Sequence, residues 1–413
     1  MIKIALLGYG TVGSGVAEVL EKNRAAIERK AGQAIEIGYI LDIRDFPGSP
    51  YRARFVRDFS VIRNDPEISV VVETMGGLEP AFTYIREALE AGKSVVTANK
   101  ELIAQKGARL LTLAEQMNKN LFFEASVGGG IPIIKPIHQC LGANEISEIA
   151  GILNGTTNFI LTKMHREDMS FSGALALAQE LGYAERDPAA DVEGQDACRK
   201  ICILASLAFG SHICPDEVYT CGITGLTRAD MACAAAWGGV VKLIARASRL
   251  PDGRVAAMVA PAFVPAESQL SSVDGVYNGI LVRGDVTGDV IFYGKGAGKL
   301  PTASAVVSDV IDAVKATGTV RTLRWREAEP GRLAPFAEYP VTACLRLADV
   351  PMAWEKAQAL FGTGRARRLA PEGLEGEVAL ITPQMSEQEL RQKIAALDEN
   401  GVRTLGMVRV LED

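Results

Sequence analysis

Histidine and paired cysteine are the scarcest features of this chain of 413 residues. Its three histidines, His138, His165 and His212, are widely separated, and none has the H-x-x-x-H spacing of a helical zinc site. The seven cysteines are an odd number without a C-x-x-C pair, so neither a disulfide framework nor a thiolate zinc site is indicated. The sequence therefore argues against histidine-based metal catalysis and indicates reduced, mostly buried thiols.

Long apolar runs and blocks of basic residues are also absent. No apolar run approaches the roughly 18 residues that span a bilayer, and the first residues reach Gly8 before a signal-peptide core could form. Lys and Arg total 44 against 50 Asp and Glu, a net charge of −6, which argues against a nucleic-acid surface. We expect a cytoplasmic protein that binds neither membrane nor nucleic acid.

The chain length predicts two or three domains. Five short apolar runs, at 2–7, 35–41, 69–72, 94–96 and 121–123, alternate with helical stretches. Strands that are apolar on both faces and alternate with helices are typical of a parallel, doubly wound sheet. We therefore predict an α/β protein with a Rossmann domain at 1–130, to which a helix at 301–318 could belong.

The remainder of the chain predicts two further units. Residues 131–325 carry longer helices with strands between them, which indicates an α+β domain. The polar stretch 318–335 contains Pro330 and Gly331 and is interpreted as a linker. Residues 336–413 show the order βαββαβ, which predicts a ferredoxin-like domain.

A glycine-rich turn follows the first predicted strand and opens the first predicted helix. Gly8, Gly10 and Gly13 match G-x-G-x-x-G, with Thr11 and Val12 inside the motif. The glycines permit a tight turn, approach of a pyrophosphate to the backbone and close helix packing, and the helix N-terminus attracts phosphate. The motif in this context predicts a nicotinamide dinucleotide, with a flavin as the less favoured ligand.

The second predicted strand ends with residues of both charges. An acidic side chain such as Asp42 would accept from the 2′-OH of NAD, whereas Arg44 would pair with the 2′-phosphate of NADP. Asp42 lies further from the glycines than the usual ~20 residues, so spacing does not decide. We favour NADP through Arg44, and leave open use of both cofactors and a reading of Asp42, Arg44 and Asp45 as surface ion pairs.

A second concentration of chemistry lies in the acidic segment 182–200. Five carboxylates fall between Glu185 and Asp196, and Asp196 and Lys200 share a helix face at i and i+4. The helix continues into an apolar run at 201–209 that must be buried. Carboxylates hold an ammonium group and a desolvated lysine transfers a proton near neutrality, so we favour a catalytic site over a capped helix with a surface ion pair.

The sequence resembles the homoserine dehydrogenases of the monofunctional type with a C-terminal regulatory domain, over essentially its full length. Segment 178–200 matches the signature of that family through Gly182, Asp191, Asp196 and Lys200. Four further blocks match in order, at 97–100, 124–132, 152–160 and 293–298. The resemblance implies that the α+β domain at 131–325 serves substrate binding, catalysis and dimerisation.

The resemblance implies reversible reduction of L-aspartate 4-semialdehyde to L-homoserine with NAD(P)H, in threonine and methionine biosynthesis. By position, Lys200 would be the proton donor and acceptor, with Lys100 assisting at the nicotinamide end. The resemblance places the substrate beside Glu185, Asp191, Asp196, Gly155 and Thr156, and the cofactor beside Lys100, Gly182, Glu185 and Gly298.

A sodium site is also implied by the resemblance. It would fall on Glu124 with the backbone carbonyls of Val127, Gly129 and Ile131, and oxygen ligands of this kind suit a hard cation. Without the resemblance, the sequence favours a flexible glycine turn before Pro132.

Residues 340–413 resemble an ACT domain, a small-molecule sensor that usually works in pairs. The family version would bind threonine as a feedback inhibitor. Here Met352 stands after Pro351, where the family pattern has glycine, so its side chain occupies the space in which an effector would approach the backbone. An amino-acid effector and a structural role in dimerisation both remain open, and a homodimer or homotetramer is implied.

Two rival functions remain. An aspartate-semialdehyde dehydrogenase needs an activated cysteine, but Cys140 lies in no recognisable nucleophile turn, and Cys198 and Cys202 share the helix of Lys200. A non-catalytic, dinucleotide-sensing regulator is the rival from another class. Such a regulator has no chemical use for a lysine among carboxylates, and the sequence therefore favours the enzyme.

Overall fold

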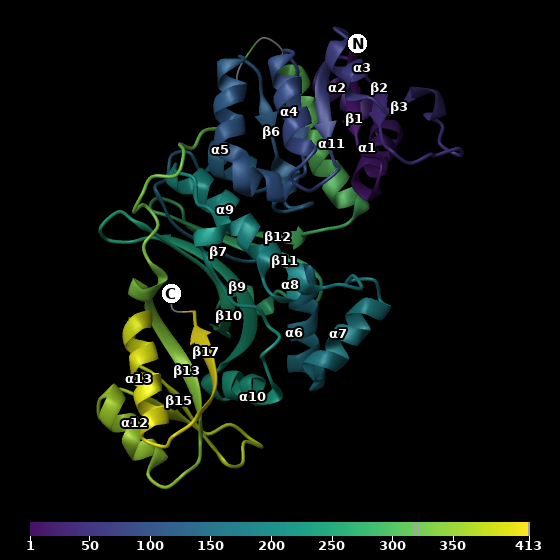
Figure 1. The fold of residues 1–413 in the computed structure, drawn as a ribbon. Helices are drawn as coiled ribbons and strands as arrows, with labels where there is room; N and C mark the ends of the chain where they lie inside the picture. The colour runs from purple at the N-terminus through teal and green to yellow at the C-terminus, as the bar shows by residue number, and fades with distance from the viewer. Residues whose placement is uncertain (317–318, 320–322, 412–413) are drawn as a thin grey trace.

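The computed structural model describes residues 1–316, 319 and 323–411. Three units follow one another along the long axis of the molecule (Figure 1). The N-terminal unit has a sheet of its own, and the other two units share a second sheet. Among the described residues, no helix combines the length and the apolarity that crossing a membrane requires.

The N-terminal unit is built on a six-stranded sheet in which every strand pair is parallel. Successive residues of the first strand face opposite layers: Ile4 and Leu6 pack in one hydrophobic core, Ala5 and Leu7 in the other. Burial on both faces explains the near-continuous apolar runs of the sequence. In sheet order the strands are β3 (Phe55–Val56), β2 (Ile35–Leu41), β1 (Ile2–Leu7), β4 (Ile68–Glu73), β5 (Ser94–Thr97) and β6 (Leu121–Phe122). This order confirms the predicted doubly wound fold.

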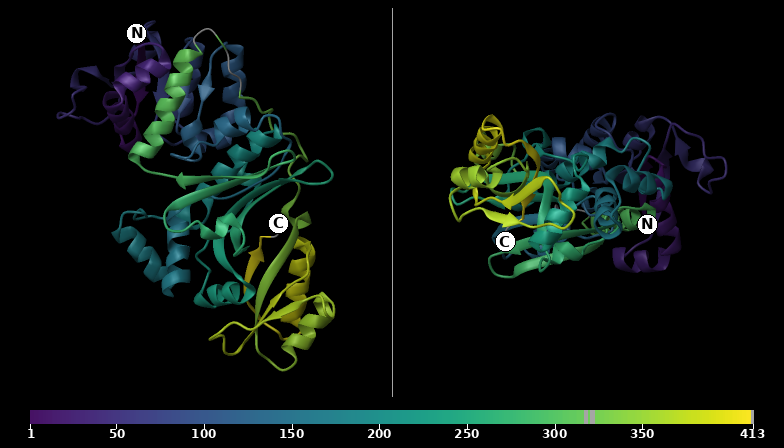
Figure 2. Two further views of the ribbon diagram at one scale, coloured as in Figure 1. Left: turned by 180° about the vertical axis from the view of Figure 1, so that it is seen from behind. Right: turned by 90° about the horizontal axis from the view of Figure 1, so that it is seen from below.

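Six helices cover this sheet, and one of them comes from late in the chain. They are α1 (Thr11–Lys22), α2 (Arg24–Ala31), α3 (Phe59–Asn64), α4 (Ala81–Glu90), α5 (Lys100–Gln116) and α11 (Lys299–Lys315). Helix α11 lies beside α1 (Figure 2), so closely that a Cβ on Gly15 would stand 2.9 Å from the Lys299 carbonyl oxygen. A helix at 299–315 therefore packs on this sheet, whereas the predicted end at residue 318 lies outside the described residues and the membership of this helix in the N-terminal domain stays a prediction.

The central unit places helices against one face of a long, mainly antiparallel sheet, in which one short strand pairs in parallel. Its strands are β7 (Ile146–Ile152), β8 (Tyr219–Thr220), β9 (Gly239–Arg249), β10 (Val255–Pro265), β11 (Tyr277–Gly284) and β12 (Gly288–Lys295). Its helices are α6 (Gly155–Glu167), α7 (Phe171–Glu180), α8 (Ala189–Val192), α9 (Gln195–Phe209) and α10 (Arg228–Trp237). Helix α9 also packs against α5, so it joins this unit to the N-terminal one (Figure 1).

The C-terminal unit has the sheet order β17-β13-β15-β14, with all three pairs antiparallel. That order is the one expected for the ferredoxin-like arrangement. Its elements are β13 (Pro340–Ala348), α12 (Ala353–Phe361), β14 (Arg367–Leu369), β15 (Glu377–Ile381), β16 (Met385–Ser386), α13 (Glu387–Glu399) and β17 (Thr404–Val410). Strand β17 pairs in parallel with β10, so the central and C-terminal units share one sheet of eleven strands.

The stretch interpreted as a linker is partly packed. Leu323 and Trp325 are buried, and the Trp325 ring meets Phe123 edge-on with centroids 5.6 Å apart. The polar composition of the segment did not reveal that Leu323 and Trp325 pack in the core. Two apolar side chains are enough to attach a mostly polar segment. The domain boundaries at 130, 325 and 336 stay a prediction.

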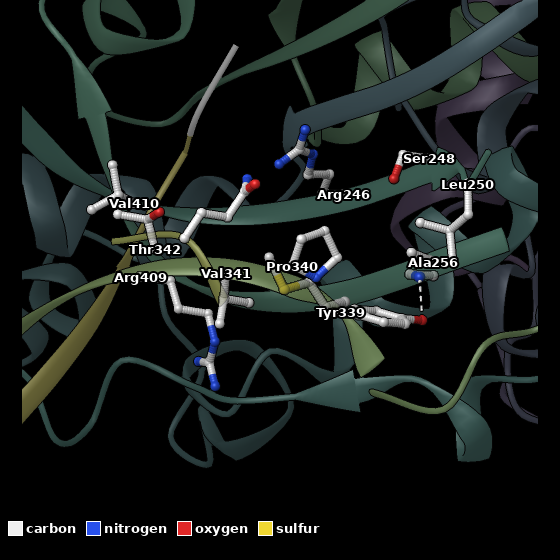
Figure 3. Close-up of a pocket in the computed structure, with 13 residues that line it drawn as sticks. Arg246, Ser248, Leu250, Ala256, Tyr339, Pro340, Val341, Thr342, Arg409 and Val410 are labelled. Carbon is white, nitrogen blue, oxygen red and sulfur yellow. Dashed lines mark hydrogen bonds between the residues drawn. The ribbon is translucent and has the colours of Figure 1, made fainter. Parts of the chain in front are cut away.

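A cavity of about 150 Å³ lies where the central and C-terminal strands diverge (Figure 3). Arg246 and Ser248 of β9 line it opposite Val341 and Thr342 of β13. Beside it the Tyr339 hydroxyl accepts a hydrogen bond of 2.7 Å from the Ala257 N–H, which ties the two units together. The cavity contains none of the residues that the sequence assigns to catalysis or cofactor binding.

A buried ion-pair cluster also joins these two units. Arg346 of β13 donates from Nε to Asp230 of α10 (2.7 Å), from Nη1 to Glu377 (2.6 Å) and from Nη2 to the Thr227 hydroxyl (3.2 Å). Thr227 and Asp230 form the capping box of α10. The C-terminal unit is therefore connected to the start of a central helix by charge as well as by the shared sheet.

Replacing this arginine tests how strongly the units are joined. We expect Arg346→Ala to destabilise the protein by ~3–5 kcal/mol, because Asp230 is left charged and buried. Arg24→Ala, which removes an exposed and solvent-screened pair with Glu21, should change stability far less than Arg346→Ala. Thermal and denaturant unfolding would measure both, and equal effects of the two substitutions would contradict the assignment.

Candidate active site

The predicted glycine turn connects β1 to α1. Gly8 has φ of +91°, which side chains disfavour, and a Cβ on Gly13 would stand 2.1 Å from the Gly8 carbonyl oxygen. Gly10 precedes the helix and contributes no side-chain cap. The N–H groups of the first turn, including those of Thr11 and Val12, remain available for an anionic ligand. The turn thus has the geometry that a pyrophosphate requires.

The end of β2 places Asp42 and Arg44 together instead of as alternatives. Asp42 accepts from the Tyr9 N–H (2.7 Å), the Arg44 N–H (2.9 Å), and Nε and Nη2 of Arg44 (3.0 and 2.9 Å). Burial opposes its ionisation, yet the hydrogen bonds from Arg44 and Tyr9 hold the pKa of Asp42 at about 2. Arg44 keeps 59% of its side chain exposed, so the cation, and not the carboxylate, faces the solvent.

Three ionisable side chains meet where α5 faces α9. Lys200 Nζ donates to Asp196 Oδ2 at 2.8 Å and to the Leu153 carbonyl oxygen at 2.7 Å. Lys100 Nζ forms an ion pair with the other oxygen of Asp196. Lys200 and Asp196 are almost fully buried, whereas the Lys100 side chain is 41% exposed. One carboxylate therefore holds two lysines, a buried one and an accessible one.

Burial separates the acidities of the two lysines. It lowers the pKa of Lys200 below the ordinary value of 10.5, and Asp196 offsets only part of this effect. For Lys100 the attraction of Asp196 outweighs burial, and the pKa is raised. Asp196 is wholly buried, which disfavours its charge, but the two ammonium groups keep its pKa well below the usual range. Lys200 is thus the lysine that releases a proton more readily.

Two helix starts bring these groups together. Asn99 caps α5 by accepting from the Leu102 N–H, so Lys100 is the first residue of that helix. Gly194, with φ of +84°, precedes α9 and places Asp196 in its first turn. Because Lys100 belongs to the N-terminal unit and Asp196 to the central one, the cluster exists only where the two units meet.

Asn154 is a site residue that the sequence interpretation missed. Its side-chain nitrogen donates to Asp191 Oδ1 (2.7 Å) and to Asp196 Oδ2 (2.9 Å), while its oxygen caps α6 by accepting from the Thr157 N–H. The signal was present, since an Asn before a helix is a preferred N-cap. What the sequence does not reveal is that the amide nitrogen reaches across to the acidic segment.

Other predicted residues lie around this cluster in different ways. Thr156 donates from its hydroxyl to the Tyr183 carbonyl oxygen at 2.7 Å, which ties α6 to the acidic segment. Gly155 packs on the backbone, because a Cβ there would stand 2.7 Å from the Val276 carbonyl oxygen. Gly182 and Gly298 have positive φ, and the Glu185 side chain is exposed. In the described part of the chain, no hydrogen bond or ion pair joins Glu185 to Lys200.

The Glu124 carboxylate, which the resemblance assigns to a sodium site, is hydrogen-bonded to the backbone of the following turn. It accepts three backbone hydrogen bonds, from Ile133 (2.6 Å), Ile134 (2.8 Å) and Lys135 (2.9 Å). Both oxygens face N–H donors, and the part of Glu124 in a sodium site stays a prediction. Within residues 1–316, 319 and 323–411, no group of three or more His, Cys, Asp or Glu side chains could hold a metal ion.

Two family models match the chain in the order of these units. The model described as "Homoserine dehydrogenase, NAD binding domain" matches residues 8–124, and the one described as "Homoserine dehydrogenase" matches residues 132–311. The first contains the glycine turn and Lys100, and the second contains Asn154, Asp196 and Lys200.

Relatives and solved structures agree over nearly the whole chain. A homoserine dehydrogenase of Pseudomonas aeruginosa is 39% identical over 414 residues, which cover 96% of this chain and 95% of the relative. The crystal structure of a homoserine dehydrogenase from Thiobacillus denitrificans superposes with a TM-score of 0.90 at 34% identity, covering 100% of this chain and 98% of that one. A hyperthermophilic archaeal homoserine dehydrogenase in complex with NADPH covers 76% of this chain and 97% of its own, with 29% identity and a TM-score of 0.64.

These matches support the enzyme and neither of its rivals. The non-catalytic regulator and the cysteine-dependent semialdehyde dehydrogenase both lack support from the matched families. A dinucleotide turn, a buried lysine held by a carboxylate and relatives of matching length lead to one conclusion: the chain belongs to the homoserine dehydrogenase family of oxidoreductases.

Proposed function

We propose that the chain interconverts L-aspartate 4-semialdehyde and L-homoserine with Lys200 as the general acid and base. The observation that carries this role is the burial of Lys200 against Asp196, beside the accessible Lys100. A bound nicotinamide dinucleotide supplies the hydride for reduction and accepts it in the reverse reaction. The residues of the chain then have to bind the amino acid and move one proton.

The proton transfer follows from the acidity of Lys200. When the aldehyde is reduced, its oxygen gains negative charge, and the Lys200 ammonium donates a proton to it. In the oxidation of homoserine, neutral Lys200 accepts the hydroxyl proton. Burial lowers the pKa of Lys200, so the neutral form is reached at lower pH than for an exposed lysine. Leu153 and Asp196 orient the amine during both directions.

The acidic segment would hold the ammonium group of the substrate. Asn154 donates to one oxygen of Asp191, and among the described residues no hydrogen bond reaches the second oxygen, which can therefore bind a cation. Glu185 stands on the exposed part of the same segment, at the rim of the site. Lys100 is the accessible cation of the cluster and would face the carboxylate or carbonyl oxygens of the substrate.

We further propose that NADP is the preferred cofactor, through Arg44. Asp42 has its oxygens occupied by Arg44 and Tyr9, so it is a poor acceptor for a ribose hydroxyl. Arg44 lines a surface depression with Arg52 and Arg57, and these three cations outnumber the two carboxylates there, Asp42 and Asp45, so a net positive charge faces a 2′-phosphate.

Three further features stay proposals. The C-terminal unit would act as an ACT-like sensor of an amino acid or as a dimerisation element in a homodimer or homotetramer; Met352 is exposed there with φ of +62°. A sodium ion near the 124–131 turn would be held by Glu124 with the carbonyls of Val127, Gly129 and Ile131, while the Glu124 carboxylate also accepts its three backbone hydrogen bonds. A cytoplasmic location is the third.

Loss of Lys200 tests the catalytic assignment. We expect Lys200→Ala to lower the rate of homoserine oxidation by about 10² to 10⁴, with dinucleotide affinity nearly kept, because proton transfer is lost while the glycine turn is untouched. Initial rates with L-homoserine and cofactor titration measure the two effects. A rate near that of the unmodified protein would remove Lys200 from the mechanism.

The pH dependence should report the same lysine. Homoserine oxidation requires neutral Lys200, so its rate should rise with pH and level off below pH 10.5, since the folded pKa is lowered from that value. Semialdehyde reduction requires the protonated form and should fall over the same interval. Profiles of kcat in both directions measure this, and a rise that continues unchanged past pH 10.5 would contradict the assignment.

Two substitutions of Asn154 can separate its role as the N-cap of α6 from its role in the active site. Asn154→Ala should raise the KM for homoserine and lower kcat, together about 10-fold to 100-fold in kcat/KM, because two carboxylates lose a charge-assisted hydrogen bond. Asn154→Ser keeps an N-cap residue but is too short to reach both carboxylates. If Asn154→Ser restored full activity, the amide would have no role in the site.

Cofactor preference can be tested at Arg44. We expect Arg44→Ala to raise the KM for NADP about 10-fold to 100-fold and to leave NAD unchanged or improved, because a charged hydrogen bond is lost and Asp42 is released. Parallel initial rates with the two cofactors measure the ratio. Equal losses with NAD and NADP would show that Arg44 does not read the 2′-phosphate.

A further inference from the structure

A fully buried carboxylate lies at the carboxyl end of β4. The glycine turn lies at the carboxyl end of the neighbouring strand β1. Glu73 is 0% exposed, and its burial raises its pKa even though four hydrogen-bonding groups favour the charged form. Its partners are backbone N–H groups and neutral side chains instead of an arginine or lysine. Burying a carboxylate without a cationic partner costs folding free energy. The hydrogen bonds that start from Glu73 show which parts of the structure this carboxylate positions.

Glu73 orders two loops at once. One oxygen accepts from the Met75 N–H (2.7 Å) and the Gly76 N–H (3.1 Å), which fixes the loop after β4. The other accepts from the Thr97 hydroxyl at 2.5 Å, at the end of the neighbouring strand β5. The carboxylate therefore bridges the carboxyl ends of β4 and β5, the edge at which ligands of such sheets bind.

The same chain of hydrogen bonds continues to Lys100. The Thr97 oxygen accepts from the Asn99 N–H at 3.0 Å, and the Asn99 side chain donates to the Gly77 carbonyl oxygen at 2.7 Å. The other end of that amide caps α5, whose first residue is Lys100. A continuous path of hydrogen bonds thus runs from Glu73 to the start of the helix that carries Lys100.

We propose that Glu73 and Thr97 are positioning residues that set where Lys100 meets Asp196. The assignment rests on the proposed function only in giving Lys100 a part in the reaction. Thr97 is the link that transmits the position, because its hydroxyl donates to Glu73 and accepts from Asn99. Neither residue touches the substrate; both act through the start of α5.

Thr97→Val removes the link while keeping the shape of the side chain. We expect kcat to fall about 10-fold to 100-fold with the KM for homoserine and the dinucleotide Kd changed little, because a displacement of about 1 Å at a reacting group has an effect of this size. Thr97→Ser keeps the hydroxyl and should restore kcat. Thr342→Val is the matched control, since Thr342 is also a buried strand threonine but its hydroxyl has no partner among the described residues.

A double-mutant comparison separates positioning from a general loss of structure. If Thr97 acts through Lys100, adding Thr97→Val to Lys100→Ala should lower kcat by less than about 2-fold further, because coupled residues are not additive. The same 10-fold to 100-fold loss in both backgrounds would overturn the proposal. Thermal unfolding of each variant shows whether it is folded, and Glu73→Gln provides a second variant that keeps the size of the side chain.

A measurement without turnover keeps this proposal distinct from the proposed function. Acylation of Lys100 by acetic anhydride, followed by mass spectrometry with exposed Lys22 as the reference, reports how tightly Asp196 holds the amine. We expect Thr97→Val to increase the relative rate by about 3-fold or more, equivalent to about half a pKa unit. An unchanged rate would overturn the positioning role even in an active enzyme. An inactive wild-type protein whose Lys100 still responds would instead overturn the proposed reaction.

Discussion

The placement of one carboxylate between two lysines is the constraint on which the site depends. Asp196 is buried, and its charge is stable there only because Lys200 and Lys100 approach it from two different units. Removing either partner would leave a charge in a poorly solvated place. The ion pair between Asp196 and Lys100 therefore stabilises the packing of α5 against α9. The interface between the two units is also the place where a substrate would react.

The remaining polar contacts extend this arrangement outward in two directions. Asn154 connects Asp196 to Asp191 and so to the acidic segment, while Asn99 connects Lys100 to Thr97 and Glu73 in the N-terminal sheet. Both asparagines are helix caps, and each uses its second polar atom to hold a neighbouring loop or carboxylate. A cap fixes the position of the first helical turn, and this determines the direction in which a side chain of that turn points.

Much of the fold and part of the site could be predicted from the residues. The glycine turn required its neighbours to be a strand and a helix, and apolar runs at regular spacing indicated the parallel sheet, which the structure has. Lys200 and Asp196 were candidates because they form an i, i+4 pair at the start of a helix whose later part is apolar, among carboxylates that suit an amino-acid substrate. Glu124 shows the limit: its residue type suits a cation, which stays a prediction, whereas the backbone amides that donate to it come from a turn whose path no local pattern describes.

The amino-acid sequence by itself determined the local elements, the dinucleotide turn and the acidic segment with its lysine, because these depend on the spacing of neighbouring residues. Only the tertiary structure decided the pairing of Asp42 with Arg44, the union of β10 with β17 in one sheet, and the meeting of Lys100 with Asp196. Each of these contacts joins residues that are not related by a helix or strand period in the sequence. Coulomb attraction and burial depend on where residues lie in the folded chain. The acidity of Lys200 belongs to the same class, since burial lowers its pKa and burial is a property of the folded chain.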